Sequence, residues 1–294
     1  MDILSFLQAN PGFFLLIIAI FSLFVGSFLN VVIHRLPIMC ERAWQSECRQ
    51  YLNLKPEAEI TAFNLCLPNS HCPNCHNAIR PWHNIPILSF LYLRGKCAKC
   101  QKSIPLRYPF VEALTAIISV FVAYKFGVSM QTVGALIFSW FAIALIFIDF
   151  DHQMLPDELT LSLLWVGLFL SIFNVFCTPS DAIIAAIVSY LFFALIQQLF
   201  QVLHKDALGQ GDLKYLAAIS TFTGWQILPI LLLIASLSGI ICILAYMILH
   251  RRFKSIPFAF GPYLALAGWI CIIWGQQIML YYTDFVQGRM YGSL

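Results

Sequence analysis

Long uninterrupted apolar runs constrain this chain more than any other feature of its sequence. Several of them reach the roughly 17–25 residues that an α-helix needs to cross a bilayer. They are continuous in Leu, Ile, Phe and Val and lack the alternation that marks the strands of an outer-membrane barrel. The chain of 294 residues is 60% hydrophobic and only 11% charged, against about 25% charged residues in soluble domains. The sequence therefore predicts an all-α polytopic membrane protein.

The first apolar run, Phe13 to Val32, has the length of a secretory signal. The segment before it carries Asp2 and no Lys or Arg, and no small-residue cleavage site follows it. A signal peptide needs a positively charged segment before the apolar run and a cleavage site with small residues after it. We therefore expect this run to be a first spanning helix that the protein keeps.

About eight spans are expected, and the distribution of positive charge orients them. We place them at residues 13–33, 108–125, 130–149, 158–177, 181–203, 213–224, 226–249 and 258–282. Lys and Arg gather on the cytoplasmic side of spanning helices. With the amino terminus outside, 15 of the 17 basic residues fall inside, and only Lys125 and Arg289 fall outside. The short sixth span belongs to this topology, because without it Arg251, Arg252 and Lys254 would change sides.

This topology divides the chain into three parts: a first helix at 1–33, a polar cytoplasmic domain at 34–107, and a seven-helix membrane domain at 108–294. Within the cytoplasmic domain, residues 38–71 show no clear periodicity and are expected to be irregular or weakly helical. The rest of that domain is organised by cysteines.

Four cysteines in two C-x2-C pairs predict a metal site. Cys72 and Cys75 are followed, after a gap of 21 residues, by Cys97 and Cys100, which is close to the four-thiolate zinc pattern. Four protein ligands leave no open position, so the zinc is expected to be structural. Two disulfides and a thioredoxin-like redox pair are the alternatives, and both are disfavoured in a reducing compartment without a βαβ unit. Other ligands within reach along the chain are Cys40, Cys48 and Cys66.

Two aspartates are expected at one depth of the membrane. Asp149 closes the third span, and Asp212 opens the sixth within the pattern Gly209-Gln210-Gly211-Asp212. Asp212 alone is equally well explained as a helix N-cap. Asp149 has no such explanation, because a helix carboxyl end is unfavourable for an anion. Asp157, which follows Pro156, is expected to cap the fourth span.

Two carboxylates in different environments can carry general acid and base hydrolysis, one accepting a proton from water and the other polarising the scissile carbonyl. The sequence contains no G-x-S-x-G, H-E-x-x-H or G-x-x-x-x-G-K-[ST] motif that would favour other machinery. A transporter or proton-coupled channel with Asp149 and Asp212 as cation ligands is the rival from another class. That rival predicts carboxylates near the middle of the membrane and leaves the cysteine domain without a use.

The chain resembles the type IV prepilin peptidases, also called leader peptidase/N-methyltransferases, almost from end to end. The resemblance is carried by Phe24-Val25-Gly26-Ser27-Phe28-Leu29-Asn30-Val31-Val32-Ile33-His34-Arg35-Leu36-Pro37, the two C-x2-C pairs, Arg94-Gly95-Lys96-Cys97, Arg107-Tyr108-Pro109-Phe110-Val111-Glu112, the segment from Ile148-Asp149 to Leu155-Pro156-Asp157, and Gly209-Gln210-Gly211-Asp212.

The resemblance implies an aspartyl peptidase of the Gly-x-Gly-Asp class with Asp149 and Asp212 as its dyad. Such enzymes remove the basic leader of prepilins and of type II secretion pseudopilins at the cytoplasmic face of the bacterial inner membrane. The members with a cysteine-bearing domain then methylate the new amino terminus with S-adenosylmethionine. The expected partners are these substrates and the lipid bilayer, with no nucleic acid, and a peptidase without methyltransferase activity is the alternative.

The methyl-donor site carries no recognisable motif, since no G-x-G-x-x-G loop is present. Glu112 lies inside the start of a span, where a charge is costly, and it either positions the new amine or pairs with Arg107; the pairing is preferred. For Gly95 and Lys96, the resemblance suggests a role linked to methylation, and a surface loop is the alternative.

Overall fold

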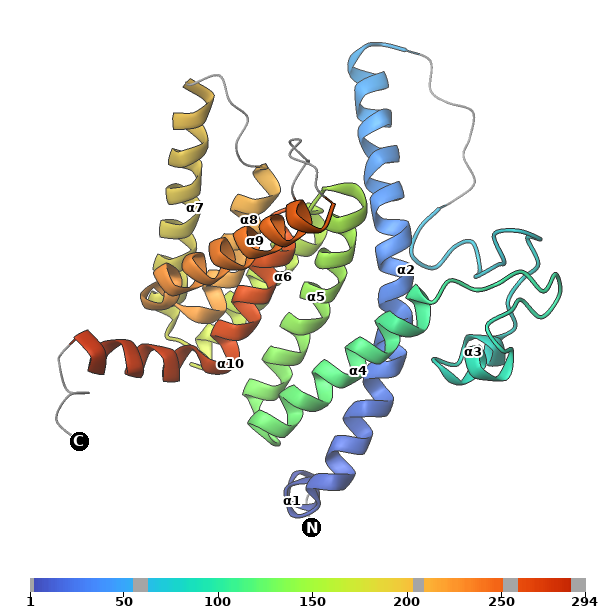
Figure 1. Ribbon diagram of the computed structural model, residues 1–294, viewed down its shortest axis with the longest axis horizontal. Coiled ribbons are helices and arrows are strands. Elements are labelled where there is room, and N and C mark those ends of the chain that lie inside the picture. Colours follow the sequence, from blue (N-terminus) through green and yellow to red (C-terminus); the bar gives the residue numbers. More distant parts are fainter. Residues whose placement is uncertain (1–2, 55–62, 203–208, 251–258, 287–294) are drawn as a thin grey trace. The chain divides into compact units, whose positions relative to one another are not determined.

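The computed structural model describes residues 3–54, 63–202, 209–250 and 259–286, and in these ranges the chain is helical and has no β-strand (Figure 1). The helices are α1 (Ile3–Ala9), α2 (Pro11–Tyr51), α3 (Leu88–Tyr92), α4 (Arg107–Phe126), α5 (Met130–His152), α6 (Asp157–Ile172), α7 (Pro179–Val202), α8 (Gln210–Thr223), α9 (Leu228–His250) and α10 (Gly261–Val286), with 3-10 turns η1 (Pro81–Asn84) and η2 (Trp225–Ile227). Five basic residues of the topology argument, Lys55, Lys205, Arg251, Arg252 and Lys254, lie outside the described residues, as does Arg289. The predicted all-α membrane fold is confirmed.

Six of the described helices are long and apolar enough to cross a membrane, namely α2, α4, α5, α7, α9 and α10. The other two expected spans correspond to α6, with 16 residues, and α8, with 14 residues. At a rise of roughly 1.5 Å per residue these two helices are shorter than the roughly 30 Å hydrocarbon core. Length and composition therefore identify six spans, and α6 and α8 differ from them in being short.

The chain forms two compact units, residues 1–132 and 133–294. In the first unit, α2 packs against α4. Helix α2 has 41 residues and a length of roughly 60 Å, about twice the thickness of the hydrocarbon core. It continues without interruption through Pro37 to Tyr51. The expectation of irregular or weakly helical structure from residue 38 onward is therefore wrong for 38–51, which are regular helix.

A buried arginine fastens the loop that precedes the first cysteine pair. Arg35 of α2 is 8% exposed and donates to the backbone carbonyls of Asn64 at 3.0 Å and Pro68 at 2.6 Å. The carbonyls replace the water that this guanidinium would otherwise bind. The cysteine segment is thereby attached to α2.

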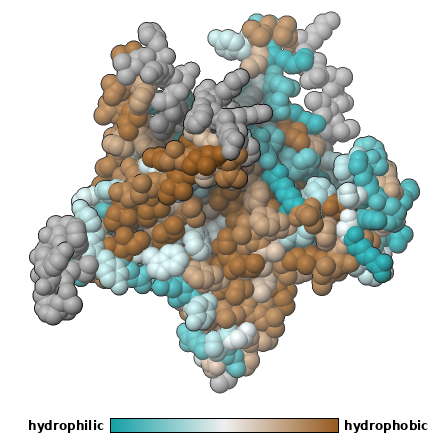
Figure 2. All heavy atoms as spheres, viewed as in Figure 1, coloured by the Kyte–Doolittle hydropathy of each residue, from teal (hydrophilic) through white to brown (hydrophobic). Residues whose placement is uncertain are grey.

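In the second unit, α8 is the central helix and packs against α6, α7 and α10. Its residues from Tyr215 to Thr223 are all buried. In contrast, apolar side chains cover the outer surface of α9 (Figure 2), as expected of a helix that faces lipid. The helix that carries the Gly-x-Gly-Asp pattern is therefore the core of its unit.

Candidate active site and metal centre

Asp149 lies in the last turn of α5 and is 5% exposed. Its Oδ2 accepts a hydrogen bond from the backbone N–H of Gly261 at 3.0 Å. Gly261 is the first residue of α10, and the first N–H groups of a helix have no partner within it. Asp149 therefore binds the amino terminus of another helix. The sequence argument that gave Asp149 no capping role is wrong, because it considered only the helix that contains this residue.

Asp212 is the third residue of α8, and Gly209 occupies the N-cap position. The alternative interpretation of Asp212 as the N-cap residue is therefore wrong by position. Its carboxylate turns back toward Gly209 and receives that residue's backbone N–H, as the third residue of a capping box does. The half-buried carboxylate is thus held at the entrance of α8.

The structure brings the two carboxylates into one site. Leu155 of the α5–α6 loop lies against the start of α8, which carries Asp212, and against the start of α10, which binds Asp149. A Cβ added at Gly211 would lie 2.9 Å from Leu155 Cβ, and one added at Gly261 would lie 3.1 Å from Leu155 Cδ2. The glycines therefore allow α8 and α10 to approach this leucine closely, and Asp212 follows one of these glycines while Asp149 contacts the other.

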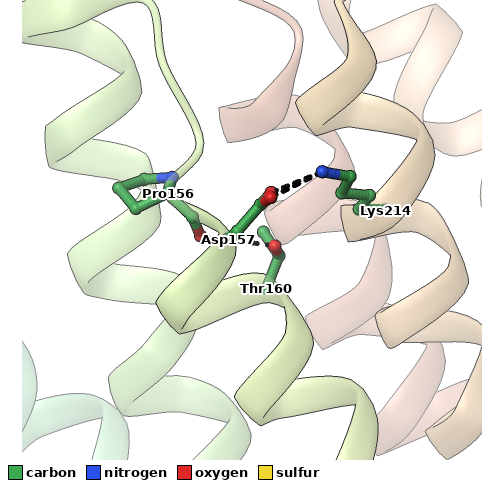
Figure 3. A network of polar contacts seen from close by, with 4 residues as sticks. All are labelled: Pro156, Asp157, Thr160 and Lys214. Carbon is green, nitrogen blue, oxygen red and sulfur yellow. Dashed lines mark hydrogen bonds and ion pairs between the residues drawn. The ribbon is translucent and has the colours of Figure 1, made fainter. Parts of the chain in front are cut away.

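An ion pair holds the start of α8 against the start of α6 (Figure 3). Lys214 Nζ lies 2.8 Å from Asp157 Oδ1 and 2.6 Å from Asp157 Oδ2. Asp157 was expected to cap the fourth span, but Pro156 occupies the N-cap position and Asp157 is the first residue of α6. The carboxylate points away from its own helix toward Lys214, two residues after Asp212.

Sequence reasoning missed Tyr215, which lies one helical turn after Asp212. Its side chain is fully buried, and its hydroxyl has no hydrogen-bond partner in the described part of the chain. The sequence signal for Tyr215 was its spacing of three residues from Asp212, which places both side chains on one face of the helix.

The four predicted ligand thiols converge in the first unit. The sulfurs of Cys72, Cys75, Cys97 and Cys100 all lie within 4.8 Å of one another, and Cys72 Sγ lies 3.8 Å from Cys100 Sγ. Tetrahedral coordination with metal–sulfur bonds of roughly 2.3 Å separates thiolates by roughly 3.8 Å. The thiols therefore fit a four-coordinate structural metal. Cys40, Cys48 and Cys66 do not belong to this cluster.

The two cysteine pairs are built alike. In the first, Cys72 N–H donates to Asn77 O and His76 N–H to Cys72 O; in the second, Cys97 N–H donates to Lys102 O and Gln101 N–H to Cys97 O. Backbone N–H groups, above all that of Cys75, hold the pKa of the Cys72 thiol below its usual value. The N–H of Cys100 does the same for the pKa of Cys97. The backbone of each turn therefore favours the thiolate form of its first cysteine, which is the form that a metal requires.

The three weak candidates for the methylation site, Gly95, Lys96 and Glu112, all lie in the first unit. Glu112 Oε2 accepts the backbone N–H of Ile87 at 2.8 Å, and its carboxylate also bonds the Ser27 side chain. These partners take the place of Arg107, which the sequence suggested. Gly95 has a φ of +68°, a conformation that glycine adopts without strain. Lys96 is exposed beside it.

Two family models match the chain, and each match lies within one unit. Residues 20–126 match the Bacterial Peptidase A24 N-terminal domain, and residues 136–244 match the Type IV leader peptidase family. Proteins named prepilin leader peptidase/N-methyltransferase are similar over nearly the whole length. The one from Stutzerimonas stutzeri is 45% identical, covering 96% of this chain and 98% of its own, and the one from Pseudomonas aeruginosa is 46% identical, covering 97% and 99%.

The chain belongs to the type IV leader peptidase family. The resemblance predicted from the sequence motifs is thereby confirmed. A more distant relative with the same name, from Neisseria gonorrhoeae, is 43% identical over 86% of this chain and 87% of its own. No solved structure matches the chain. In this member of the family, the carboxylate pair lies in the unit that matches the peptidase and the thiol cluster in the unit that matches the amino-terminal domain.

Proposed function

We propose that this protein removes the basic leader from type IV prepilins and type II secretion pseudopilins and then methylates the new amino terminus with S-adenosylmethionine. The observation that carries the peptidase activity is the convergence of Asp149 and Asp212 around Leu155. The methyltransferase activity is supported by the relatives, whose names include both functions and which match the chain over nearly its full length. The domain at 34–107 serves methylation, and the part at 108–294 is the peptidase.

In the proposed mechanism, Asp149 and Asp212 share the work of hydrolysis. One carboxylate accepts a proton from the attacking water, and the other, protonated, donates to the oxygen of the scissile carbonyl. The N–H of Gly261 fixes the rotamer of Asp149, and the N–H of Gly209 fixes that of Asp212. Each carboxylate therefore meets the peptide bond in a prepared orientation, which lowers the entropic barrier.

The site is proposed to face the cytoplasm at the inner membrane, with eight crossings in total. The distribution of basic residues supports this orientation. A prepilin helix lies in the bilayer with its leader in the cytoplasm, so carboxylates at the membrane boundary meet the scissile bond. The short helices α6 and α8 would bring Asp212 and the neighbouring ion pair of Lys214 and Asp157 to that boundary.

We assign one structural zinc ion to Cys72, Cys75, Cys97 and Cys100. The metal would hold the two turns together and would not activate water, because the four thiolates complete its coordination. For S-adenosylmethionine, the candidate residues are Gly95, Lys96 and Glu112, all close to this site in the sequence.

The direct test uses the purified protein in liposomes with a prepilin and labelled S-adenosylmethionine. We expect loss of the leader followed by label on the new amino-terminal residue. Cleavage without label would leave a peptidase alone, and absence of cleavage with both aspartates intact would contradict the proposal.

Substituting Gly261 is expected to impair cleavage by displacing Asp149. In Gly261→Ala, the new Cβ would lie 2.6 Å from Asp149 Oδ2, so the carboxylate must move. We expect the initial rate of leader cleavage to fall about 100-fold, the size of effect that a displacement of about 1 Å can have. Gly12→Ala is the control, because its Cβ would meet nothing within 4 Å. Equal rates in the two variants would contradict this role.

Breaking the ion pair between Lys214 and Asp157 is expected to lower the cleavage rate, with only a small loss in the free energy of unfolding. Lys214 and Asp157 are 29% and 52% exposed, so their attraction is screened and Lys214→Met should lower the free energy of unfolding by less than about 1 kcal/mol. We expect a loss of about fivefold in cleavage rate, since Asp212 is two residues away. The exchanged double variant Asp157→Lys/Lys214→Asp should recover most of the rate. A double variant no better than the single one would mean that the pair does not position α8.

A further inference from the structure

Helix α3 is fastened at the level of the first turns of α4. The backbone N–H of Ile87, which immediately precedes α3, donates to Glu112 Oε2 at 2.8 Å. Glu112 is 8% exposed and is the sixth residue of α4, a candidate membrane span. Because this bond joins the two segments directly, the start of α3 lies beside the second turn of α4, near the end of that candidate span.

Apolar side chains of α3 and of the preceding turn η1 are exposed on the surface of the protein. Leu88, Leu91 and Tyr92 are 65%, 66% and 81% exposed, and Trp82 of η1, which packs against α3, is 58% exposed. A helix of five residues is too short to bury these side chains against its own surface. Leucine together with Trp and Tyr is the composition that settles at the boundary between headgroups and hydrocarbon.

The surroundings of α3 are cationic. Between residues 63 and 106 the chain contains no Asp or Glu, and the basic residues there, all exposed, are Arg80, Arg94, Lys96, Lys99 and Lys102. Arg94 and Lys96 follow α3 directly, and the Arg80 guanidinium lies 5.6 Å from the centre of the Trp82 ring. The apolar helix is therefore flanked by positive charge on both sides along the chain, in a segment whose visible face is hydrophilic (Figure 2).

We propose that α3, with Arg80, Arg94 and Lys96, is a membrane-interface anchor that binds anionic phospholipid headgroups. Its leucines and Tyr92 enter the headgroup boundary, and the three cations bind lipid phosphates, as basic and aromatic segments beside membranes do. Glu112 is then a positioning residue that sets the depth of α3 through Ile87. The alternative occupant, a prepilin leader, is basic under the proposed function and would be repelled by these charges.

The test places a benzophenone side chain at Tyr92 in the full-length protein, reconstituted in nanodiscs that contain phosphatidylglycerol. Tyr51 is the matched control, because it is an 89% exposed tyrosine at the end of α2, roughly 27 Å beyond the expected end of the first span. After illumination, mass spectrometry should find phospholipid adducts at position 92 and only background at 51. Metal content of the labelled protein checks that the cysteine segment stays folded.

Two further comparisons test the parts of the proposal separately. Replacing phosphatidylglycerol by phosphatidylcholine should lower the yield of adducts at position 92. The variant Arg94→Gln/Lys96→Gln should lower this yield about fivefold for each basic residue removed. Leu88→Ser/Leu91→Ser should lower it in both lipids. Adducts to protein in place of lipid, or equal yields at 92 and 51, would overturn the anchor; a yield independent of lipid charge would overturn the anionic headgroups. These readouts do not depend on peptidase or methyltransferase activity, so they are independent of the proposed function.

Discussion

Asp149→Asn and Asp212→Asn are each expected to reduce leader cleavage by about 10,000-fold or more, a typical loss when one member of a catalytic group is removed. Asparagine keeps the size of the side chain and an oxygen that can accept the N–H of Gly261 or Gly209. It cannot accept a proton from water or donate an acidic one. The fold should therefore survive while the chemistry is lost. Initial rates with a purified prepilin, followed by the shift in mass of the pilin, measure the effect.

Two controls separate this result from general damage. Asp181→Asn changes another carboxylate of the same unit, which accepts from Trp225 and Gln226 at 3.1 Å each, and it should cleave at the parent rate. Methylation of a pilin that has already lost its leader should continue in both dyad variants. Because the aspartates act as a unit, the double variant should be hardly slower than either single one. Cleavage within tenfold of the parent in either single variant would exclude the dyad.

Cys72→Ser is expected to remove the metal. A structural zinc site draws its stability from four thiolates, and its binding energy is folding energy for the surrounding segment. Serine at position 72 supplies neither a thiolate nor the geometry. We expect zinc, measured by mass spectrometry of the purified protein, to fall from about one ion per chain to near zero. Limited proteolysis should then cut within residues 63–106, and methylation should be lost.

Cys48→Ser is the matched control, because Cys48 is an exposed thiol of α2 that does not belong to the cluster. It should retain the metal and both activities. Leader cleavage in Cys72→Ser should exceed that of the Asp149→Asn variant by several orders of magnitude, since Asp149 lies in the other compact unit. An unchanged zinc content in Cys72→Ser would contradict the four-cysteine assignment.

Some features of the site followed from short stretches of sequence. The two cysteine turns are local structures, in which all backbone hydrogen bonds join residues at most nine positions apart. Their pattern was therefore visible in the spacing alone. The continuation of α2 through Pro37 to Tyr51 could not be seen in the sequence. Residues 38–51 lack the apolar run that identified the first span, and a polar helix that extends from a span has little periodicity of its own.

The sequence by itself determined the membrane class, the four-cysteine cluster, the family and the two candidate carboxylates, because hydropathy, turn spacing and motif order are each encoded within a few neighbouring residues. Only the tertiary structure decided what each carboxylate touches. Asp149 meets Gly261, 112 positions away; Asp157 pairs with Lys214 rather than capping its own helix; and Glu112 binds Ile87 in place of Arg107. These partners depend on which faces of distant helices meet, and helix-to-helix packing is set by the fit of the whole unit rather than by any local pattern.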